Sequence, residues 1–376
     1  MVRRSWAAYD DAFSMTGLSM NIIADENLAL TDYFFADLGT VQQHAGRQLQ
    51  AAQLKDAELL LVRSVTAVNQ ALLQGSAIKF VGSATIGTDH LDIDYLEQQQ
   101  ITWANAAGCN AQAVAEYVIA AILAVQPQQL YRGQQFCLGI VGLGNVGTRL
   151  ARVAERLGWR VIAYDPFCQS TQTQQVSWQD VLAQSDAISI HVPLTHDGEH
   201  PTYHLFDQKA LAQMPAHSML INSARGAVVE EQALIENIMA TGRAVVLDVF
   251  EHEPKISQQL LSLLSLATPH IAGYSLEGKA RGTQMIYEAY CRSVALPTDK
   301  TFRSQLTTAE SLYQNESLQD FLAQHLTQIY AIREDDQKLR ACLRHGQIEP
   351  AAFDDLRKHY PLRREWSAHG LPCFAE

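Results

Sequence analysis

Short apolar runs alternate with segments of helical spacing from Met20 onward. The runs at residues 21–24, 59–62, 79–82 and 102–105 are predicted to form strands, and the segments between them to form helices. Alternation of strand and helix is typical of a parallel sheet with crossover helices. We therefore predict a first α/β unit in this part of the chain.

A second series of strands follows a long segment rich in Ala, Ile and Val. Residues 111–125, ended by Pro127, are predicted to form a buried helix at a domain junction. Six strands are then predicted, at residues 137–141, 160–164, 187–191, 219–222, 244–247 and 266–267. Six strands with intervening helices favour a doubly wound sheet.

The two ends of the chain differ from this α/β pattern. After Gly273 a helical run continues to about Ala295, and the region from 300 to 376 is richer in Gln, Arg and Glu, with a helical stretch predicted at 317–334. Residues 1–19 precede the first strand. We expect them to be an N-terminal extension without a fixed fold.

Composition and charge limit the possible functions. A chain of 376 residues is long enough for two or three domains, and 47% apolar with 18% charged residues indicates folded cores rather than disorder. The net charge of −12 makes nucleic acid and anionic membranes poor partners. Neither a spanning apolar segment nor a secretory signal is found, so we expect a soluble cytoplasmic protein.

The cysteines and histidines predict neither disulfides nor a metal site. The six cysteines are scattered without a C-x-x-C pair. His196, His200 and His204 are regularly spaced, but Pro and Gly residues around them make a continuous helix improbable.

Gly142-Leu143-Gly144-Asn145-Val146-Gly147 forms a G-x-G-x-x-G between the predicted strand 137–141 and a helix over 146–157. In this position the glycines permit a tight turn, close approach to a pyrophosphate and close packing of helix on strand. Asp165 ends the next strand, where its carboxylate can accept hydrogen bonds from ribose hydroxyls and repel a 2′-phosphate. The alternative is an ordinary glycine turn followed by a solvated acid; the complete arrangement favours an NAD site.

Three downstream residues offer the groups that oxidation of a secondary alcohol requires. Arg225 follows a predicted strand and can hold a carboxylate in a bidentate fork. His270 is a candidate base, and Glu253, if the fold brings it near, would orient the imidazole and favour its cation. Taken singly, a surface charge, a loop acid and a core histidine are commoner explanations of these three residues than catalysis.

Residues 142–147, 222–226, 247–254 and 268–273 together resemble the D-isomer-specific 2-hydroxyacid dehydrogenases. The resemblance implies NAD as cofactor and catalytic roles for Arg225, Glu253 and His270. It places Asp248 on the nicotinamide amide. The cofactor contacts that it implies are Gly142, Gly144, Asn145, Val146, Gly147, Asp165, Val192, Ser223, Ala224, Arg225, Asp248 and Gly273.

The same resemblance implies two Rossmann-like doubly wound parallel-sheet domains plus a smaller C-terminal α+β domain. The substrate-binding domain would be discontinuous, comprising residues 20–112 and 274–298. Residues 113–273 would bind NAD, and residues 299–376 would form a C-terminal dimerisation domain.

Within the family, residues 25–27, 62–66, 84–90, 108–111 and 270–282 and the C-terminal region resemble a branch that acts on a small phosphorylated 2-hydroxy acid. Ala107 departs from the expected Pro. This branch implies a homodimer and substrate contacts from Ser64, Thr85 and Tyr274. Ser64 and Thr85 are about as well explained as strand-end caps. Weaker candidates for charge near the phosphate are Arg63, Lys279 and Arg281.

Two alternatives remain open. One is another enzyme of the family, such as a 3-phosphoglycerate dehydrogenase, which would keep the same Arg, Glu and His; the C-terminal region argues against it. The other is a non-catalytic NAD-sensing scaffold of the same fold, which can retain these residues and is excluded only by turnover.

Overall fold

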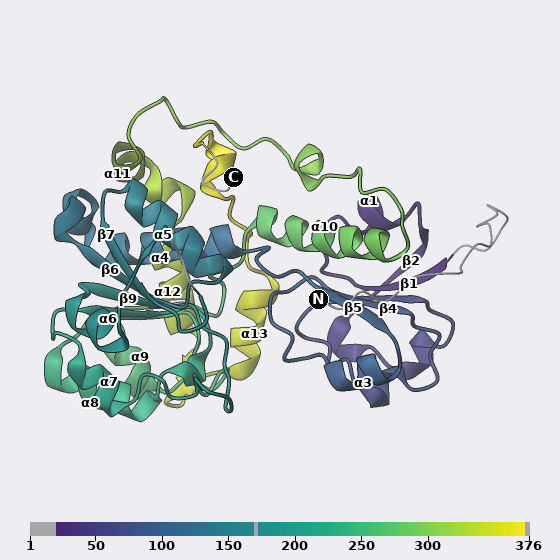
Figure 1. Cartoon of the computed structure of the whole chain (residues 1–376), viewed down its shortest axis with the longest axis horizontal. Helices are drawn as coiled ribbons and strands as arrows, with labels where there is room; N and C mark the ends of the chain where they lie inside the picture. The colour runs from purple at the N-terminus through teal and green to yellow at the C-terminus, as the bar shows by residue number, and fades with distance from the viewer. Residues whose placement is uncertain (1–19, 169–171, 373–376) are drawn as a thin grey trace.

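The computed structural model describes residues 20–168 and 172–372, which form two parallel sheets side by side with a helical C-terminal region folded over them (Figure 1). The predicted N-terminal extension lies outside the described residues. Both sheets are those of doubly wound α/β domains, so the predicted fold class is confirmed.

The first sheet has five parallel strands in the order β2-β1-β3-β4-β5. These strands are β1 (Met20–Asp25), β2 (Gly39–His44), β3 (Leu59–Val62), β4 (Phe80–Ser83) and β5 (Thr102–Asn105). The helices of this part are α1 (Thr31–Phe35), α2 (Gln70–Leu73) and α3 (Ile93–Gln98). Strand β2 was not predicted, because this edge strand is mostly polar and only partly buried.

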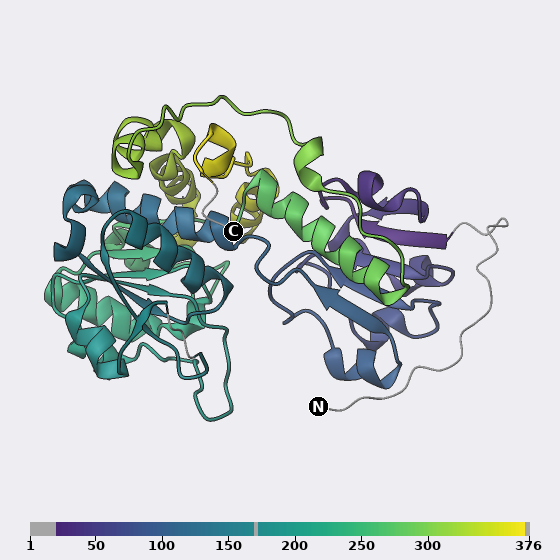
Figure 2. The ribbon, with the colours of Figure 1, turned by 45° about the horizontal axis from the view of Figure 1, so that its top comes forward.

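The chain returns to the first sheet late in the sequence. Helix α10 (Leu276–Ser293) packs against β4, β5 and α1, and Figure 2 shows it lying along the sheet. Its buried residues include Ile286 and Tyr287, which join the apolar cluster around Phe34 and Phe35. The segment after Gly273 is therefore part of the first sheet's packing.

The second sheet has seven parallel strands, not the predicted six, in the order β12-β11-β10-β9-β6-β7-β8. They are β6 (Cys137–Val141), β7 (Arg160–Tyr164), β8 (Gln174–Gln175), β9 (Ala187–Ile190), β10 (Met219–Asn222), β11 (Val245–Leu247) and β12 (Leu266–Ala267). The additional strand β8 is two glutamines at the edge, without an apolar signal. The strand order runs one way from β6 through β7 to β8 and the other way from β6 through β9 to β12. The point beside β6 where the direction changes is the place where doubly wound sheets bind ligands.

Helices cover both faces of this sheet. They are α4 (Ala111–Val125), α5 (Asn145–Arg156), α6 (Trp178–Gln184), α7 (Gln208–Gln213), α8 (Glu231–Thr241) and α9 (Gln258–Leu263). Helix α4 is buried at every residue from Ala111 to Leu123, which confirms the buried helix predicted there. The short 3₁₀ helices are η1 (Gly46–Gln48), η2 (Ala51–Leu54), η3 (Pro127–Tyr131), η4 (Gly133–Gln135), η5 (Gly226–Val228), η6 (Phe302–Gln305) and η7 (Trp366–His369).

The C-terminal region crosses from α10 to the second sheet (Figure 1). It contains α11 (Leu318–Ile329), α12 (Ile332–Ala341), the hairpin β13 (Leu343–Arg344) with β14 (Gln347–Ile348), and α13 (Pro350–Lys358). The single helical stretch predicted at 317–334 is wrong: the chain becomes extended at Tyr330, whose buried ring packs near Tyr117. Helix α12 packs on α4 and β12, and α13 lies between the two sheets in Figure 1.

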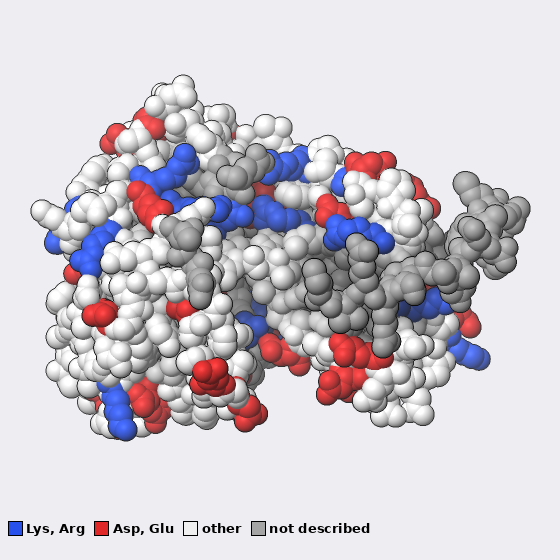
Figure 3. All heavy atoms as spheres, in the orientation of Figure 1, with Lys and Arg blue, Asp and Glu red and all other residues white. Residues whose placement is uncertain are grey.

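Charged side chains of both signs are spread over the face shown in Figure 3, and the surface is hollowed between the two halves. Within residues 20–168 and 172–372, no helix combines the length and apolarity that crossing a bilayer requires.

Candidate active site

The residues predicted to bind the cofactor gather at the carboxyl ends of the central strands. Because these strands are parallel and adjacent, their following loops open on one edge of the sheet. This edge carries the glycine loop after β6, Asp165 after β7, Val192 after β9, Ser223 and Ala224 after β10, and Asp248 after β11. Gly273 follows the turn after β12.

The glycine loop leaves room for a phosphate at the start of α5. Gly144 is the N-cap residue, no side chain caps the helix, and a Cβ placed on Gly144 would meet open space. The first turn, Asn145 to Gly147, therefore presents backbone N–H groups to an anion. Nearby, the Ser223 hydroxyl is buried without a hydrogen-bond partner among the described residues. These features fit a bound dinucleotide.

Asp165 joins the glycine loop to the end of β7. Its Oδ2 accepts a hydrogen bond from the Leu143 N–H at 2.7 Å, and its Oδ1 accepts from the N–H groups of Phe167 and Cys168 at 2.9 and 3.2 Å. The carboxylate is thus held in place by three backbone donors, at the position where a ribose is expected. Ribose binding by Asp165 stays a prediction.

Glu253 and His270 form the expected acid and imidazole pair, with Oε1 and Nδ1 2.8 Å apart. Burial alone would raise the pKa of Glu253, but the hydrogen bond and charge of His270, with the charge of Arg357, lower it. An ionised Glu253 accepts a hydrogen bond from Nδ1–H, so the other ring nitrogen, Nε2, is the one available to act as a base.

Asp248 organises the turn that carries His270. Its Oδ1 accepts from the Thr268 hydroxyl at 2.6 Å and the Ile271 N–H at 2.8 Å, and its Oδ2 accepts from the Ala272 N–H at 2.9 Å. The Tyr117 hydroxyl lies 2.7 Å from that of Thr268 and extends this network into α4. The structure therefore gives Asp248 a positioning role; its contact with a nicotinamide amide stays a prediction.

Arg225 lies between the two sheets. Its Nη2 is 3.1 Å from Oδ2 of Asp89, which belongs to the loop after β4. The next residue, Gly226, packs so closely on the backbone of Phe250 that a Cβ would lie 2.0 Å from the Phe250 carbonyl. This contact fixes the segment carrying Arg225 against the segment leading to Glu253.

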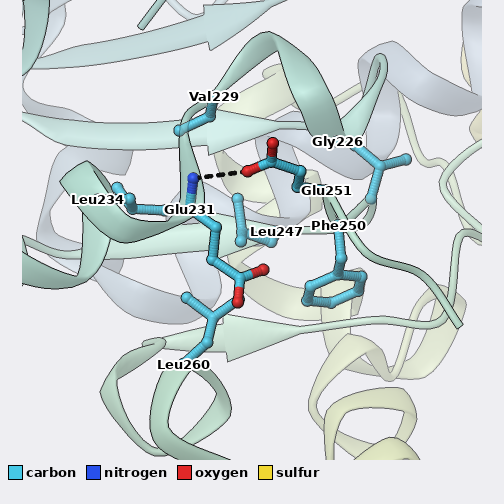
Figure 4. A pocket seen from close by; sticks show the side chains of 9 residues that line it. Gly226, Val229, Glu231, Leu234, Leu247, Phe250, Glu251 and Leu260 are labelled. Carbon is cyan, nitrogen blue, oxygen red and sulfur yellow. Dashed lines mark hydrogen bonds between the residues drawn. The ribbon is translucent and has the colours of Figure 1, made fainter. Parts of the chain in front are cut away.

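Figure 4 shows the small pocket beside that contact, with Glu251 accepting a hydrogen bond from the Glu231 N–H at 2.8 Å. Its volume is about 10 Å³, with Gly226, Phe250 and Glu251 among the lining residues. A cavity of this size holds at most one water molecule. It is a feature of the packing beneath Arg225, and it is too small for a substrate.

The three predicted substrate residues come from three segments. Ser64 is exposed after β3, and Thr85 lies after β4 with its hydroxyl 2.8 Å from that of Ser83. Tyr274 follows Gly273, and its hydroxyl is 3.5 Å from Nη2 of Arg357 on α13. Their contact with substrate stays a prediction.

Among the weaker cationic candidates, only Lys279 lacks an ion-pair partner within the described residues. Arg63 pairs with Asp25 at 3.1 Å, and Arg281 pairs with Glu365 at 2.8 Å. The Lys279 Nζ lies 4.9 Å from the centre of the Tyr274 ring. Burial, together with the charge of Arg63, lowers the pKa of Lys279 to about 8.

Several site residues could not be predicted from the sequence. Asp89 and Thr268 lie within the stretches 84–90 and 268–273 that carry the resemblance, but the sequence assigns neither of them a role. Arg357 lies in a polar segment without a motif, and Tyr117 resembles an ordinary core residue. Asn110 packs against Gly273, and its Oδ1 is buried without a partner among the described residues. No cluster of three or more potential metal ligands occurs in that part of the chain.

Comparison with known families agrees with this geometry. Residues 124–272 match the model described as "D-isomer specific 2-hydroxyacid dehydrogenase, NAD binding domain", the class that the strand order and the Arg225, Glu253 and His270 set define. Residues 299–374 match "Domain of unknown function (DUF3410)".

The relatives define the group more narrowly. Erythronate-4-phosphate dehydrogenase of Acinetobacter baylyi is 62% identical over 94% of this chain and 99% of its own. The enzyme of the same name from Psychrobacter arcticus is 46% identical over 93% of this chain and all of its own length. The chain belongs to the erythronate-4-phosphate dehydrogenase family.

Solved structures support the fold. The D-lactate dehydrogenase of Aquifex aeolicus, complexed with NAD and lactic acid, is 24% identical with a TM-score of 0.60, over 73% of this chain and 95% of its own. An NAD-dependent formate dehydrogenase of Staphylococcus aureus is 22% identical with a TM-score of 0.58. The likeness covers 73% of this chain and 96% of the formate dehydrogenase chain. At these identities both likenesses show the fold alone.

Proposed function

We propose that this protein oxidises 4-phospho-D-erythronate to (R)-3-hydroxy-2-oxo-4-phosphooxybutanoate with NAD, a step of pyridoxal 5′-phosphate synthesis. The observation that carries the proposal is the Glu253–His270 pair, 2.8 Å apart, at the sheet edge that bears the dinucleotide loop and Arg225. The extensive identity to enzymes named for this substrate supports the choice of acid.

The residues of the chain divide the reaction between them. The Arg225 guanidinium binds the substrate carboxylate, which replaces the Asp89 carboxylate as its partner. Nε2 of His270 takes the proton from the C2 hydroxyl, while Glu253 holds Nδ1–H and stabilises the imidazolium that forms. The NAD held at the glycine loop would supply the acceptor for the hydride that leaves C2.

The wider predictions on assembly and location belong to the same proposal. The region 299–376 acts as a dimerisation domain, which makes the enzyme a homodimer of the cytoplasm. Light scattering on the full chain should give twice the monomer mass. A monomer at micromolar concentration would contradict the homodimer without contradicting the proposed reaction.

The reaction is tested by following nicotinamide absorbance with 4-phospho-D-erythronate and 3-phospho-D-glycerate in parallel. Single-turnover conditions are included, since tightly held NADH would hide a slow cycle. We expect preference for the four-carbon acid and its loss in His270→Ala. Preference for phosphoglycerate would keep the family chemistry and reject this substrate. No reduction with either acid would favour the scaffold alternative.

A further inference from the structure

Helix α13 brings a guanidinium from the C-terminal region to the candidate active site. Arg357 is half-buried, and its Nη2 is 3.5 Å from the hydroxyl of Tyr274. Its charge also acts on Glu253, the partner of His270. The side chain therefore lies beside the turn that carries the catalytic histidine, although it is more than 80 residues away in sequence.

No carboxylate of the described residues lies within ion-pair distance of this half-buried guanidinium, although its charge acts on Glu253. Within residues 20–168 and 172–372, Arg357 forms no ion pair, and its Nε is buried without a hydrogen-bond partner. An unsatisfied buried donor costs about 1–3 kcal/mol in folding, so a site that retains one is suited to a ligand that supplies the acceptor. The Nε of Arg363 is also buried without a partner among the described residues, but the two Nη atoms of Arg363 donate to three backbone carbonyls. The Nη atoms of Arg357 have only the 3.5 Å contact with Tyr274 in that part of the chain.

A second cation contacts the same tyrosine. Lys279 on α10 lies over the Tyr274 ring at 4.9 Å and forms no ion pair in the described part of the chain. The nearby Arg63 and burial disfavour its charge, whereas a bound anion would favour it. Tyr274 thus has one cation at its hydroxyl and another at its ring, contributed by two different parts of the chain.

The substrate of the proposed function has two anionic groups, a carboxylate and a phosphate. Arg225, which faces the exposed Asp89, is available for the carboxylate. A phosphate dianion offers three acceptor oxygens and is best held by more than one cation together with a neutral donor. Arg357, Lys279 and Tyr274 supply that combination.

We propose that Arg357 of the C-terminal region and Lys279 of α10 form, with Tyr274, a clamp for the phosphate of the substrate. This inference rests on the proposed function for its ligand. It gives the C-terminal region a part in substrate selection: α13 completes the site within its own chain.

The test compares substrates with and without the phosphate. The kcat and KM of the NAD-loaded enzyme are measured with 4-phospho-D-erythronate and D-erythronate, and calorimetry gives the affinity of both for the NADH complex. Arg357→Gln is expected to lower kcat/KM and affinity for the phosphorylated acid about 30-fold or more, and to change those for D-erythronate less than about 3-fold. Arg357→Lys should recover part of the loss.

Lys358→Gln is the matched control, because Lys358 is the next residue of α13 and is exposed. It should behave like the wild type. Equal losses with both acids in Arg357→Gln, or no loss with the phosphorylated acid, would overturn the clamp. A wild type that prefers 3-phospho-D-glycerate would reject the proposed substrate without rejecting the clamp. In that case, comparing 3-phospho-D-glycerate with D-glycerate in Arg357→Gln still tests whether Arg357 binds the phosphate.

Discussion

Arg225 and Asp89 form an ion pair between the two sheets, with Nη2 and Oδ2 3.1 Å apart. Arg225 follows β10 of the second sheet and Asp89 lies in the loop after β4 of the first. Asp89 is 73% exposed and Arg225 is 35% exposed, so water screens their attraction. The pair keeps the guanidinium oriented, and in the proposed mechanism the substrate carboxylate replaces the weakly held Asp89.

The first prediction concerns this exchange. Asp89→Asn removes the competing carboxylate, and because an exposed pair contributes about 0–1 kcal/mol, KM for the acid should fall by at most about 5-fold. The kcat should stay within about 2-fold, since Asp89 has no role in the proton transfer. Steady-state kinetics at low salt provide the measurement. A large rise in KM would mean that Asp89 assists substrate binding.

Glu253→Gln is predicted to impair the chemical step. A glutamine can keep a hydrogen bond to Nδ1 of His270, but it cannot stabilise the imidazolium by charge, so kcat should fall about 100-fold or more. NADH affinity, measured by fluorescence titration, should change little.

The neighbouring residue Glu251 offers a matched control for this change. Its carboxylate pairs with another histidine, His204, at 2.6 Å, and accepts from the Glu231 N–H. Glu251→Gln should retain most of kcat. Similar losses in both variants would show that the effect is structural and not specific to His270.

Asp165→Ala is predicted to weaken NAD binding and reduce discrimination against NADP. The change removes a carboxylate that would repel a 2′-phosphate and also frees three backbone N–H groups of the loop. Asp165→Asn, which keeps an acceptor oxygen, should bind NAD better than the alanine variant. Dissociation constants for the two cofactors measure this directly. An unchanged ratio of the two constants would remove Asp165 from the cofactor site.

The central strands could be predicted because burial on both faces requires continuous apolar runs. Strands β6, β7 and β10 coincide with the predicted segments. Edge strands lack this requirement: β2 is Gly-Thr-Val-Gln-Gln-His and β8 is Gln-Gln. The break after Ile329 was also missed, because neither glycine nor proline marks it. There the tertiary packing of Tyr330 determines the backbone.

Parts of the site could be predicted for a related reason. A glycine loop after a strand has a local signature, and Glu253 and His270, predicted as a pair from the sequence, do meet in the structure. Asp89 and Arg357 depend instead on how the first sheet and the C-terminal region pack beside the second sheet. The stretch 84–90 around Asp89 carries the resemblance, but no local pattern assigns a role to the Asp89 carboxylate or to Arg357, so only the structure associates these two charges with the site.

Arg363 is predicted to be important for stability. Its guanidinium donates to the carbonyls of Tyr274, Ala113 and Ala272 at 2.6–2.8 Å, and its side chain lies over the Tyr330 ring. Arg363→Met leaves these carbonyls without their donor and should cost about 3 kcal/mol in the free energy of unfolding.

Urea denaturation measures this cost as a lower midpoint at an unchanged slope. The exposed Arg344, which donates to carbonyls of its own turn, is the control: Arg344→Met should change stability by no more than about 0.5 kcal/mol. Comparable midpoints for the two variants would contradict the role of Arg363.

Lys279 gives the phosphate clamp a pH dependence. The charged groups that act on it are Arg63, which with burial lowers its pKa to about 8, and Asp25, which raises it. Lysine carries its charge below its pKa, so KM for the phosphorylated acid should be constant well below pH 8 and rise up to about 10-fold for each pH unit above it.

Lys279→Arg keeps the charge and should remove this rise, while KM for D-erythronate should show no rise in either enzyme. KM profiles from about pH 6 to about pH 10 test this; a rise that persists in Lys279→Arg would assign the titration to another group.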